Sequence, residues 1–198
     1  MHRILNKIIH KPTIITTIFL FLIAFIIFLI LLTYIKSQYS YTLTYISSEI
    51  ASKIKDVKLM KVIENGTDFF LVNFLSLKGI SPVIFQAKIN TIFTFTLPIT
   101  LAIFISLLPY LEKKFRATIE VIIILISIHI LYILSHELYE LTKFLIYREV
   151  EQPRKIPFYF YQYLSVFTKE MIIRFEPFLL GLYIYLRFRK KIVSQEAS

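Results

Sequence analysis

Three side chains that could bind a metal or relay protons share one helical stripe of the sequence. His129, His136 and Glu140 follow the spacing i, i+7 and i+11 within one segment, so they would lie on one face of a helix. Zinc accepts such nitrogen and oxygen ligands. At 1.5 Å per residue, however, His129 and Glu140 lie about 16 Å apart along the axis, too far for one ion to contact both. We therefore favour an interfacial polar stripe, with a metal site or proton relay as the alternative.

The stretch SHELYE, residues 135–140, does not complete the H-E-x-x-H pattern of zinc-binding helices, because Glu140 stands where the second histidine is needed. The chain has no cysteine, which removes cysteine nucleophiles and thiolate metal ligands. It also shows no Ser–His–Asp pattern and no glycine-rich phosphate loop. We therefore predict a protein that is not an enzyme and binds no cofactor.

A second group of charged residues lies near the C-terminal apolar run. Glu170 and Arg174 are separated by four residues, so they can pair on a helix, whereas Arg174 and Glu176 point to different sides. Two interpretations stay open. The charges lie at the membrane interface, where arginine reaches the headgroups, or they contact polar groups of a partner at the membrane rim. Glu170, Arg174 and Glu176 are therefore candidate partner contacts.

Composition indicates the elements that must position these residues. Of 198 residues, 57% are hydrophobic, against about 45–50% in soluble domains. We predict an all-α membrane protein with four transmembrane helices and a small α+β extracytoplasmic insert. The predicted transmembrane helices are residues 12–35, 89–111, 117–136 and 169–186. The predicted segments between and around them are 1–11, 36–88, 112–116, 137–168 and 187–198.

The first run, 12–35, contains no charged residue and offers no small-residue cleavage site, so we interpret it as a retained anchor. Lysine and arginine concentrate in 1–11, 112–116 and 187–198, which predicts that these segments, and both termini, are cytoplasmic. This placement accounts for the net charge of +10 without a nucleic-acid partner. We expect a multi-pass protein of the inner (cytoplasmic) membrane, with no small-residue packing motif in its spans.

The insert at 36–88 is expected to combine a short helix with a β-hairpin. Ile46, Ile50 and Ile54 would form the apolar face of the helix. Asn65-Gly66 predicts a type I′ turn between strands at about 57–64 and 68–76. After the third span, 137–168 is predicted to be an extracytoplasmic amphipathic segment. The helix of the third span continues into it and is predicted to end at Pro153 and Pro157.

The order of features resembles the exosortase H-associated membrane proteins. The resemblance is carried by "FTLPITLAIFISLLP", residues 95–109, and by "IIRFEPFLLGLYIYL", residues 172–186. It implies a non-catalytic accessory partner of a membrane cysteine transpeptidase that sorts exported proteins in the cell envelope. Two alternatives stay open: a scaffold subunit of another envelope assembly, for secretion or polysaccharide export, or a small transporter or metal-dependent membrane protein. The expected partners are the lipid bilayer and another integral membrane protein.

Overall fold

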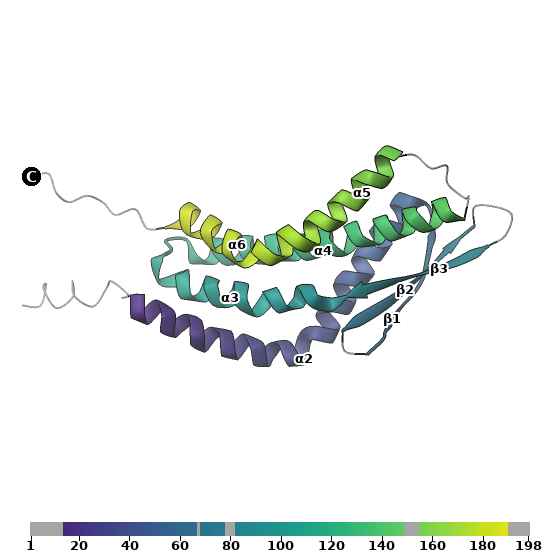
Figure 1. The fold of residues 1–198 in the computed structure, drawn as a ribbon. Coiled ribbons are helices and arrows are strands. Elements are labelled where there is room, and N and C mark those ends of the chain that lie inside the picture. The colour runs from purple at the N-terminus through teal and green to yellow at the C-terminus, as the bar shows by residue number, and fades with distance from the viewer. Residues whose placement is uncertain (1–13, 67, 78–81, 149–154, 190–198) are drawn as a thin grey trace, which may run out of the picture.

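The computed structural model describes residues 14–66, 68–77, 82–148 and 155–189 (Figure 1). The predicted N-terminal segment 1–11 and most of the predicted tail lie outside these residues. The helices are α2 (Ile14–Lys55), α3 (Thr96–Leu107), α4 (Lys114–Tyr147), α5 (Lys155–Phe167) and α6 (Ile173–Phe188). The strands are β1 (Lys58–Glu64), β2 (Phe69–Ser76) and β3 (Val83–Asn90). Shorter helical turns are Thr91–Phe95, Leu108–Tyr110 and the π-helical Thr168–Ile172.

Three helical segments of the described chain are long and apolar enough to cross a membrane: Ile14–Lys55, Thr91–Tyr110 and Lys114–Tyr147. This indicates a membrane-embedded protein that is mostly helical and carries a small antiparallel sheet. The fourth predicted span is not among the three. α6 has only 16 residues, because the charged stretch before it is held in the π-helical turn Thr168–Ile172 rather than in a continuous apolar helix.

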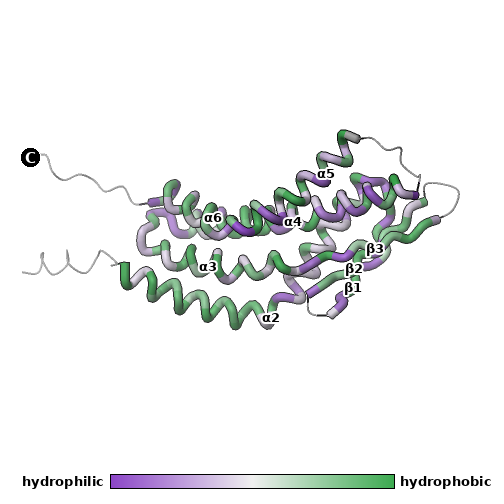
Figure 2. Tube along the Cα trace, in the orientation of Figure 1, coloured by the Kyte–Doolittle hydropathy of each residue, from purple (hydrophilic) through white to green (hydrophobic). Residues whose placement is uncertain are grey.

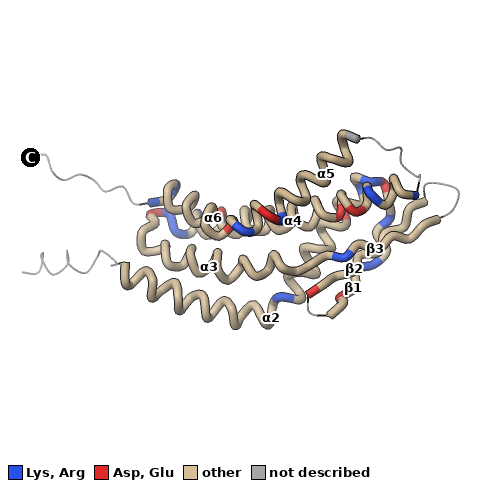
Figure 3. The backbone as a smooth tube through the Cα atoms, in the orientation of Figure 1, with Lys and Arg blue, Asp and Glu red and all other residues tan. Residues whose placement is uncertain are grey.

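One end of the molecule is an apolar bundle, which we define as α2 up to residue 35, α3, α4 up to residue 134, and α6. Its packed core is formed by Leu32, Leu97, Phe104, Leu111, Ala117, Val121, Leu125, Leu180, Ile184 and Phe188. The first half of α2 and all of α3 carry no charged residue (Figures 2 and 3). α3 and α6 pack closely, since a Cβ added at Gly181 would meet Ile103 Cγ2 at 2.6 Å.

The other end is the sheet module, which we define as residues 36–55 of α2, strands β1–β3, and residues 135–147 of α4. The sheet has the antiparallel order β1-β2-β3. Alternate residues of the central strand, Phe70, Val72 and Phe74, are buried against the helices, as expected of a strand with one covered face. The sheet module therefore has a core of its own beside that of the bundle.

The predicted hairpin is confirmed, with strands at Lys58–Glu64 and Phe69–Ser76. The predicted type I′ turn is wrong. Such a turn needs positive φ at both central residues, and Gly66 has φ 72° whereas Asn65 does not. The connection runs from residue 65 to residue 68 and is closed by the Asn65 amide donating to the Phe69 carbonyl at 2.9 Å.

The strand β3 is absent from the sequence prediction, which starts the second span at residue 89. In the structure Ile89 and Asn90 are the last residues of β3, and the helical segment begins at Thr91. Pro98 lies in the first turn of α3, where its missing N–H costs no helical hydrogen bond. Pro157 lies likewise in the first turn of α5.

The predicted short helix of the insert is the second half of α2, which continues unbroken to Lys55. Its predicted apolar face, Ile46, Ile50 and Ile54, is exposed. The buried face also includes Leu43 and Lys55 but consists mainly of small residues, namely Ser40, Thr44, Ser47, Ser48, Ala51 and Ser52. Small side chains allow close helix approach, so these residues, which lie beyond the predicted span 12–35, pack α2 against α4.

The predicted continuation of the third span is confirmed, since α4 runs as one helix from Lys114 to Tyr147. The described helix ends that flank the segments predicted to be cytoplasmic lie at one end of the bundle (Figure 1). Thr17 of α2 lies 2.5 Å from the Tyr110 hydroxyl, and the Glu112 amide donates to the Phe188 carbonyl at 3.0 Å. The start of α2, the connection from α3 to α4, and the end of α6 are therefore neighbours.

Candidate functional site

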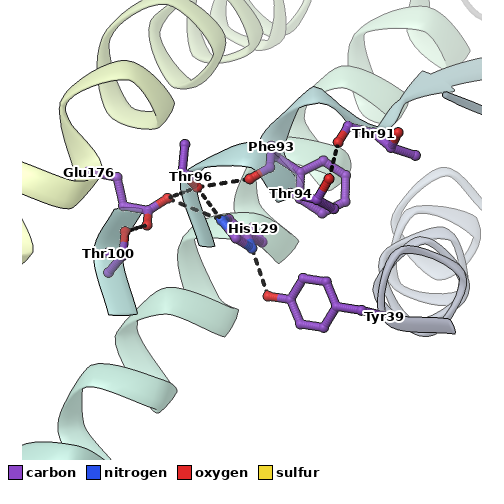
Figure 4. A network of polar contacts seen from close by, with 8 residues as sticks. All are labelled: Tyr39, Thr91, Phe93, Thr94, Thr96, Thr100, His129 and Glu176. Carbon is purple, nitrogen blue, oxygen red and sulfur yellow. Dashed lines mark hydrogen bonds and ion pairs between the residues drawn. The ribbon is translucent and has the colours of Figure 1, made fainter. Parts of the chain in front are cut away.

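A buried polar network joins four helices at the junction between the apolar bundle and the sheet module (Figure 4). It consists of Tyr39 from α2, Thr96 and Thr100 from α3, His129 from α4, and Glu176 from α6. His129 is 0% exposed and Glu176 is 1% exposed. A buried carboxylate and imidazole are costly to desolvate unless each finds hydrogen-bond partners.

Both oxygens of Glu176 accept hydrogen bonds from α3. The Thr100 hydroxyl donates to Oε1 at 2.8 Å, and the Thr96 hydroxyl lies 3.0 Å from Oε2. These two threonines are four residues apart, so they project from one face of α3 toward the carboxylate. His129 Nε2 lies 3.1 Å from the same Oε2.

The other imidazole nitrogen faces α2. The Tyr39 hydroxyl lies 2.7 Å from His129 Nδ1, and the Phe93 ring packs against the imidazole with a centroid distance of 5.1 Å. One proton arrangement satisfies the whole network: Tyr39 donates to Nδ1, and the Nε2–H donates to Glu176. Thr96 then shares its hydroxyl proton between Glu176 and the Phe93 carbonyl, which is 2.8 Å away.

His129, Glu176 and Thr100 of this network are almost fully buried, whereas Tyr39 and Thr96 are half-buried. The gap beside the network in the bundle leaves no room for a water molecule, and its walls are Thr100, Phe104, Leu107, Val121, Leu180, Gly181 and Ile184. Polar groups enclosed in this way stabilise contacts between helices. The described part of the chain therefore shows no substrate path through this site.

The three residues of the predicted polar stripe have different surroundings. His129 belongs to the buried network. The imidazole of His136 lies 3.3 Å from the Lys88 carbonyl of β3, and Glu140 lies one turn farther along α4. No group of three or more His, Cys, Asp or Glu side chains in the described residues is arranged to hold a metal ion. The structure thus pairs His129 with Glu176 rather than with His136 or Glu140.

The three candidate partner contacts, Glu170, Arg174 and Glu176, do not lie on one surface. Glu170 and Arg174 form an exposed ion pair, the i, i+4 pairing that their spacing predicts. Glu176 instead points into the bundle and contacts α3 and α4. The structure therefore corrects the expectation that Glu176 faces a partner, and leaves Glu170 and Arg174 on the surface.

A second buried carboxylate lies in the sheet module. Glu137 of α4 is fully buried, and the Ser48 hydroxyl of α2 donates to its Oε1 at 2.5 Å. Its Oε2 has no hydrogen-bond partner among the described residues. Ser48 belongs to the small-residue face of α2, so this bond helps to fix the contact between α2 and α4.

Sequence reasoning missed Tyr39, Thr96, Thr100 and the pair Ser48–Glu137 as members of polar contacts. Hydroxyl groups at i, i+4 spacing in an apolar segment, such as Thr96 and Thr100, were a usable signal for a buried carboxylate partner. The partner itself could not be read from spacing, because Thr100 and Glu176 are 76 residues apart in sequence.

The fold and the network define a helical membrane-embedded protein with a small sheet module and a buried polar junction. Comparisons of the chain found no matching protein-family model, no matching curated protein and no matching solved structure.

Proposed function

We propose that this chain is a non-catalytic integral membrane accessory protein that presents the helix α5 to a partner protein. The observation that carries the proposal is an exposed aromatic face on α5, defined as Tyr159, Phe160, Tyr163 and Val166. Tyr159 and Tyr163 are 61% and 67% exposed. Exposed apolar patches of this kind mark interaction sites, and tyrosine and phenylalanine are enriched at protein interfaces.

The position of this face supports a protein partner rather than lipid alone. α5 departs from the direction of α6 (Figure 1) and packs on α4, where Phe158 and Tyr139 have ring centroids 5.8 Å apart. Tyr139 lies in the half of α4 that belongs to the sheet module. The aromatic face therefore extends beyond the apolar bundle, toward the side of the sheet.

The proposed topology has four spans in the inner membrane, with α6 crossing beside α3 and both termini in the cytoplasm. Two features support it. α6 lies along α3 (Figure 1), and the basic residues near 113–116 and 187–189 gather at one end of the bundle (Figure 3). In this topology the sheet module, α5 and the exposed pair Glu170–Arg174 are extracytoplasmic.

The partner class is proposed from the sequence resemblance. An exosortase-type cysteine transpeptidase would have its active site on the extracytoplasmic side, where α5 and the sheet module lie in the proposed topology. The buried network at His129 and Glu176 fits an accessory role, because it holds helices together without a cavity for a substrate.

Site-specific photo-crosslinking in the native membrane tests this proposal. A benzophenone amino acid is placed at Tyr163, and the matched control carries it at Leu22, an exposed apolar residue in the first half of α2. We expect a protein adduct from position 163 only, identified by mass spectrometry as a membrane cysteine transpeptidase. An adduct with another envelope protein would keep the accessory role and reject the transpeptidase. Lipid adducts alone at both positions would overturn the proposal.

A further inference from the structure

A basic cavity lies at the opposite end of the bundle from the sheet module. It has a volume of about 230 Å³ and is lined by Glu112, Lys113, Arg116, Arg187 and Phe188. The cavity forms where α4 begins and α6 ends, and the bond from the Glu112 amide to the Phe188 carbonyl holds the two segments together. Charged residues are visible at this end in Figure 3.

One carboxylate holds two guanidinium groups beside this cavity. Glu120 Oε1 lies 3.2 Å from Arg116 Nε and 3.2 Å from Arg187 Nη2. The Tyr183 hydroxyl donates to Glu120 Oε2 at 3.2 Å, and Arg187 in turn donates to Tyr183. Because a guanidinium carries five N–H groups, Arg116 and Arg187 keep donors beyond those used by Glu120 and Tyr183. Glu120 therefore places both arginines side by side with free donors.

The charge around the cavity remains positive. The basic side chains here are Lys113, Lys114, Arg116, Arg187 and Arg189, which give five positive charges, and the acidic ones are Glu112 and Glu120, which give two negative charges. The difference, five minus two, is three positive charges. The side chains of Arg116 and Arg187 are 62% and 45% exposed, so they can reach a ligand at the membrane surface. Paired arginines with free donors suit a phosphate oxygen geometry.

Exposed apolar side chains flank this basic cluster. Phe115 of α4 is 80% exposed, and Leu186 of α6 and Ile119 of α4 are also exposed. Arg187 lies over the Phe188 ring at 5.6 Å from its centroid. A free phosphate ion would use only the arginines, whereas a phospholipid would place its phosphate on the arginines and its acyl chains along these apolar residues.

We propose that this cavity binds the phosphate of an anionic phospholipid headgroup, held by Arg116 and Arg187 with Lys113. The site is separate from the aromatic face of α5 and from the buried network, so it does not depend on the proposed partner. A lipid bound there would fix the depth of α4 and α6 in the membrane at this end of the bundle. The protein would then bind anionic lipids in preference to neutral ones.

Native mass spectrometry of the full chain from nanodiscs tests the site. The probe is an equimolar mixture of phosphatidylglycerol and phosphatidylcholine. We expect wild-type protein to retain phosphatidylglycerol preferentially, and the variant Arg116→Ala/Arg187→Ala to lose this preference by about 25-fold, or about fivefold for each charge. The matched control, Arg148→Ala/Arg174→Ala, removes two exposed arginines outside the cavity and should retain the wild-type preference.

A second variant, Lys113→Gln/Lys114→Gln, covers the case in which the double arginine variant does not fold. It leaves the contacts of Glu120 intact and should lower the preference in the same direction. The proposal would be overturned if this variant and a folded Arg116→Ala/Arg187→Ala variant both kept the wild-type preference for phosphatidylglycerol. Equal retention of both lipids by wild-type protein together with binding of inorganic phosphate by lipid-free protein would also overturn it, since that would indicate a phosphate site without lipid recognition.

Discussion

Replacing Glu176 by leucine should destabilise the apolar bundle through the donors that it leaves behind. Three donors face the carboxylate: the Thr96 and Thr100 hydroxyls and the His129 imidazole. Thr96 keeps a second acceptor, the Phe93 carbonyl at 2.8 Å. Thr100 loses its acceptor on Glu176, beside a gap that has no room for water. His129 Nε2 loses its carboxylate partner and keeps the Thr96 hydroxyl, which is 3.1 Å away.

The expected loss of unfolding free energy follows from these contacts. An orphaned buried donor costs about 1–3 kcal/mol, a cost that applies in full to the Thr100 hydroxyl and in part to the His129 imidazole. Hydrogen bonds between membrane helices average only about 0.6 kcal/mol, and three such bonds give about 2 kcal/mol. We therefore expect Glu176→Leu to cost about 2–4 kcal/mol. Glu176→Gln keeps one acceptor oxygen and should cost about half as much.

Unfolding by denaturing detergent, monitored by circular dichroism in bicelles, measures this loss. The matched control is Glu170→Gln, six residues earlier, which removes an exposed carboxylate paired with Arg174. Exposed ion pairs contribute about 0–1 kcal/mol, so the control should stay close to wild type. Equal stability of Glu176→Leu and this control would refute the inference that the network holds the helices together.

A double-mutant cycle separates the contact between Glu176 and His129 from general disruption of the bundle. The single variants Glu176→Leu and His129→Leu each remove one partner of the buried contact, whereas the double variant removes both. Because the two atoms lie 3.1 Å apart, the double variant should be less destabilised than the sum of the singles by about 0.5–3 kcal/mol. Additive losses would show that the two side chains act independently.

Three further predictions concern other parts of the fold. Ser48→Ala removes the donor to the buried carboxylate Glu137 and should lower the unfolding free energy by about 1–3 kcal/mol in the same detergent assay. Gly181→Leu places a side chain where α3 and α6 touch and should cost about 1–3 kcal/mol or more, while a wild-type value would show that α6 can move away from α3. Since the chain has no cysteine, single cysteines at Met60 and Phe115 should react with an impermeant maleimide from opposite sides of the membrane, and labelling from one side would reject the proposed topology.

Much of the helical framework follows from apolar runs. The absence of charge over 14–35 and the apolar core of 121–134 are enough to place α2 and α4, and Asn65-Gly66 is enough to place the hairpin. The end of α2 was not predictable in this way. Lys36 is the first charged residue after the apolar run, but the helix does not end there, and the Lys36 side chain pairs with Asp68 at 2.7 Å. The predicted first span and the predicted helix of the insert are therefore one continuous helix, α2.

The orientation of the second half of α2 shows why amphipathic patterns can mislead in such a chain. The spacing of Ile46, Ile50 and Ile54 correctly indicates a helix, yet these residues are exposed. The buried face carries serine and threonine because close approach to α4 and the sheet needs small side chains and hydrogen bonds more than apolar volume. β3 was missed for a related reason: its apolar residues merge in sequence with those of the next span.

Two residues of the candidate site, but not their pairing, could be predicted from the sequence. His129 and Glu176 both stand out as polar residues in apolar segments, and each is a functional candidate on that ground. Spacing along one helix relates His129 only to neighbours such as His136, whereas its partner comes from α6, 47 residues away. Pairings between helices depend on packing geometry, which a single sequence does not contain.

The position of the network connects the two parts of the molecule. Tyr39 packs against the cores of both the sheet module and the apolar bundle, and Glu176 fixes the start of α6 against α3 and α4. The turn before α6 is held as well, because the Thr168 hydroxyl lies 2.7 Å from the Ser135 hydroxyl of α4. Since α5 leads directly into this turn, these buried contacts set the direction in which α5 leaves the bundle. Apolar packing alone would fix the distance between the helices at this junction but not their register, whereas a buried carboxylate and imidazole fix both. This gives a physical reason for the buried pair in a protein that must present the aromatic face of α5 at a fixed angle.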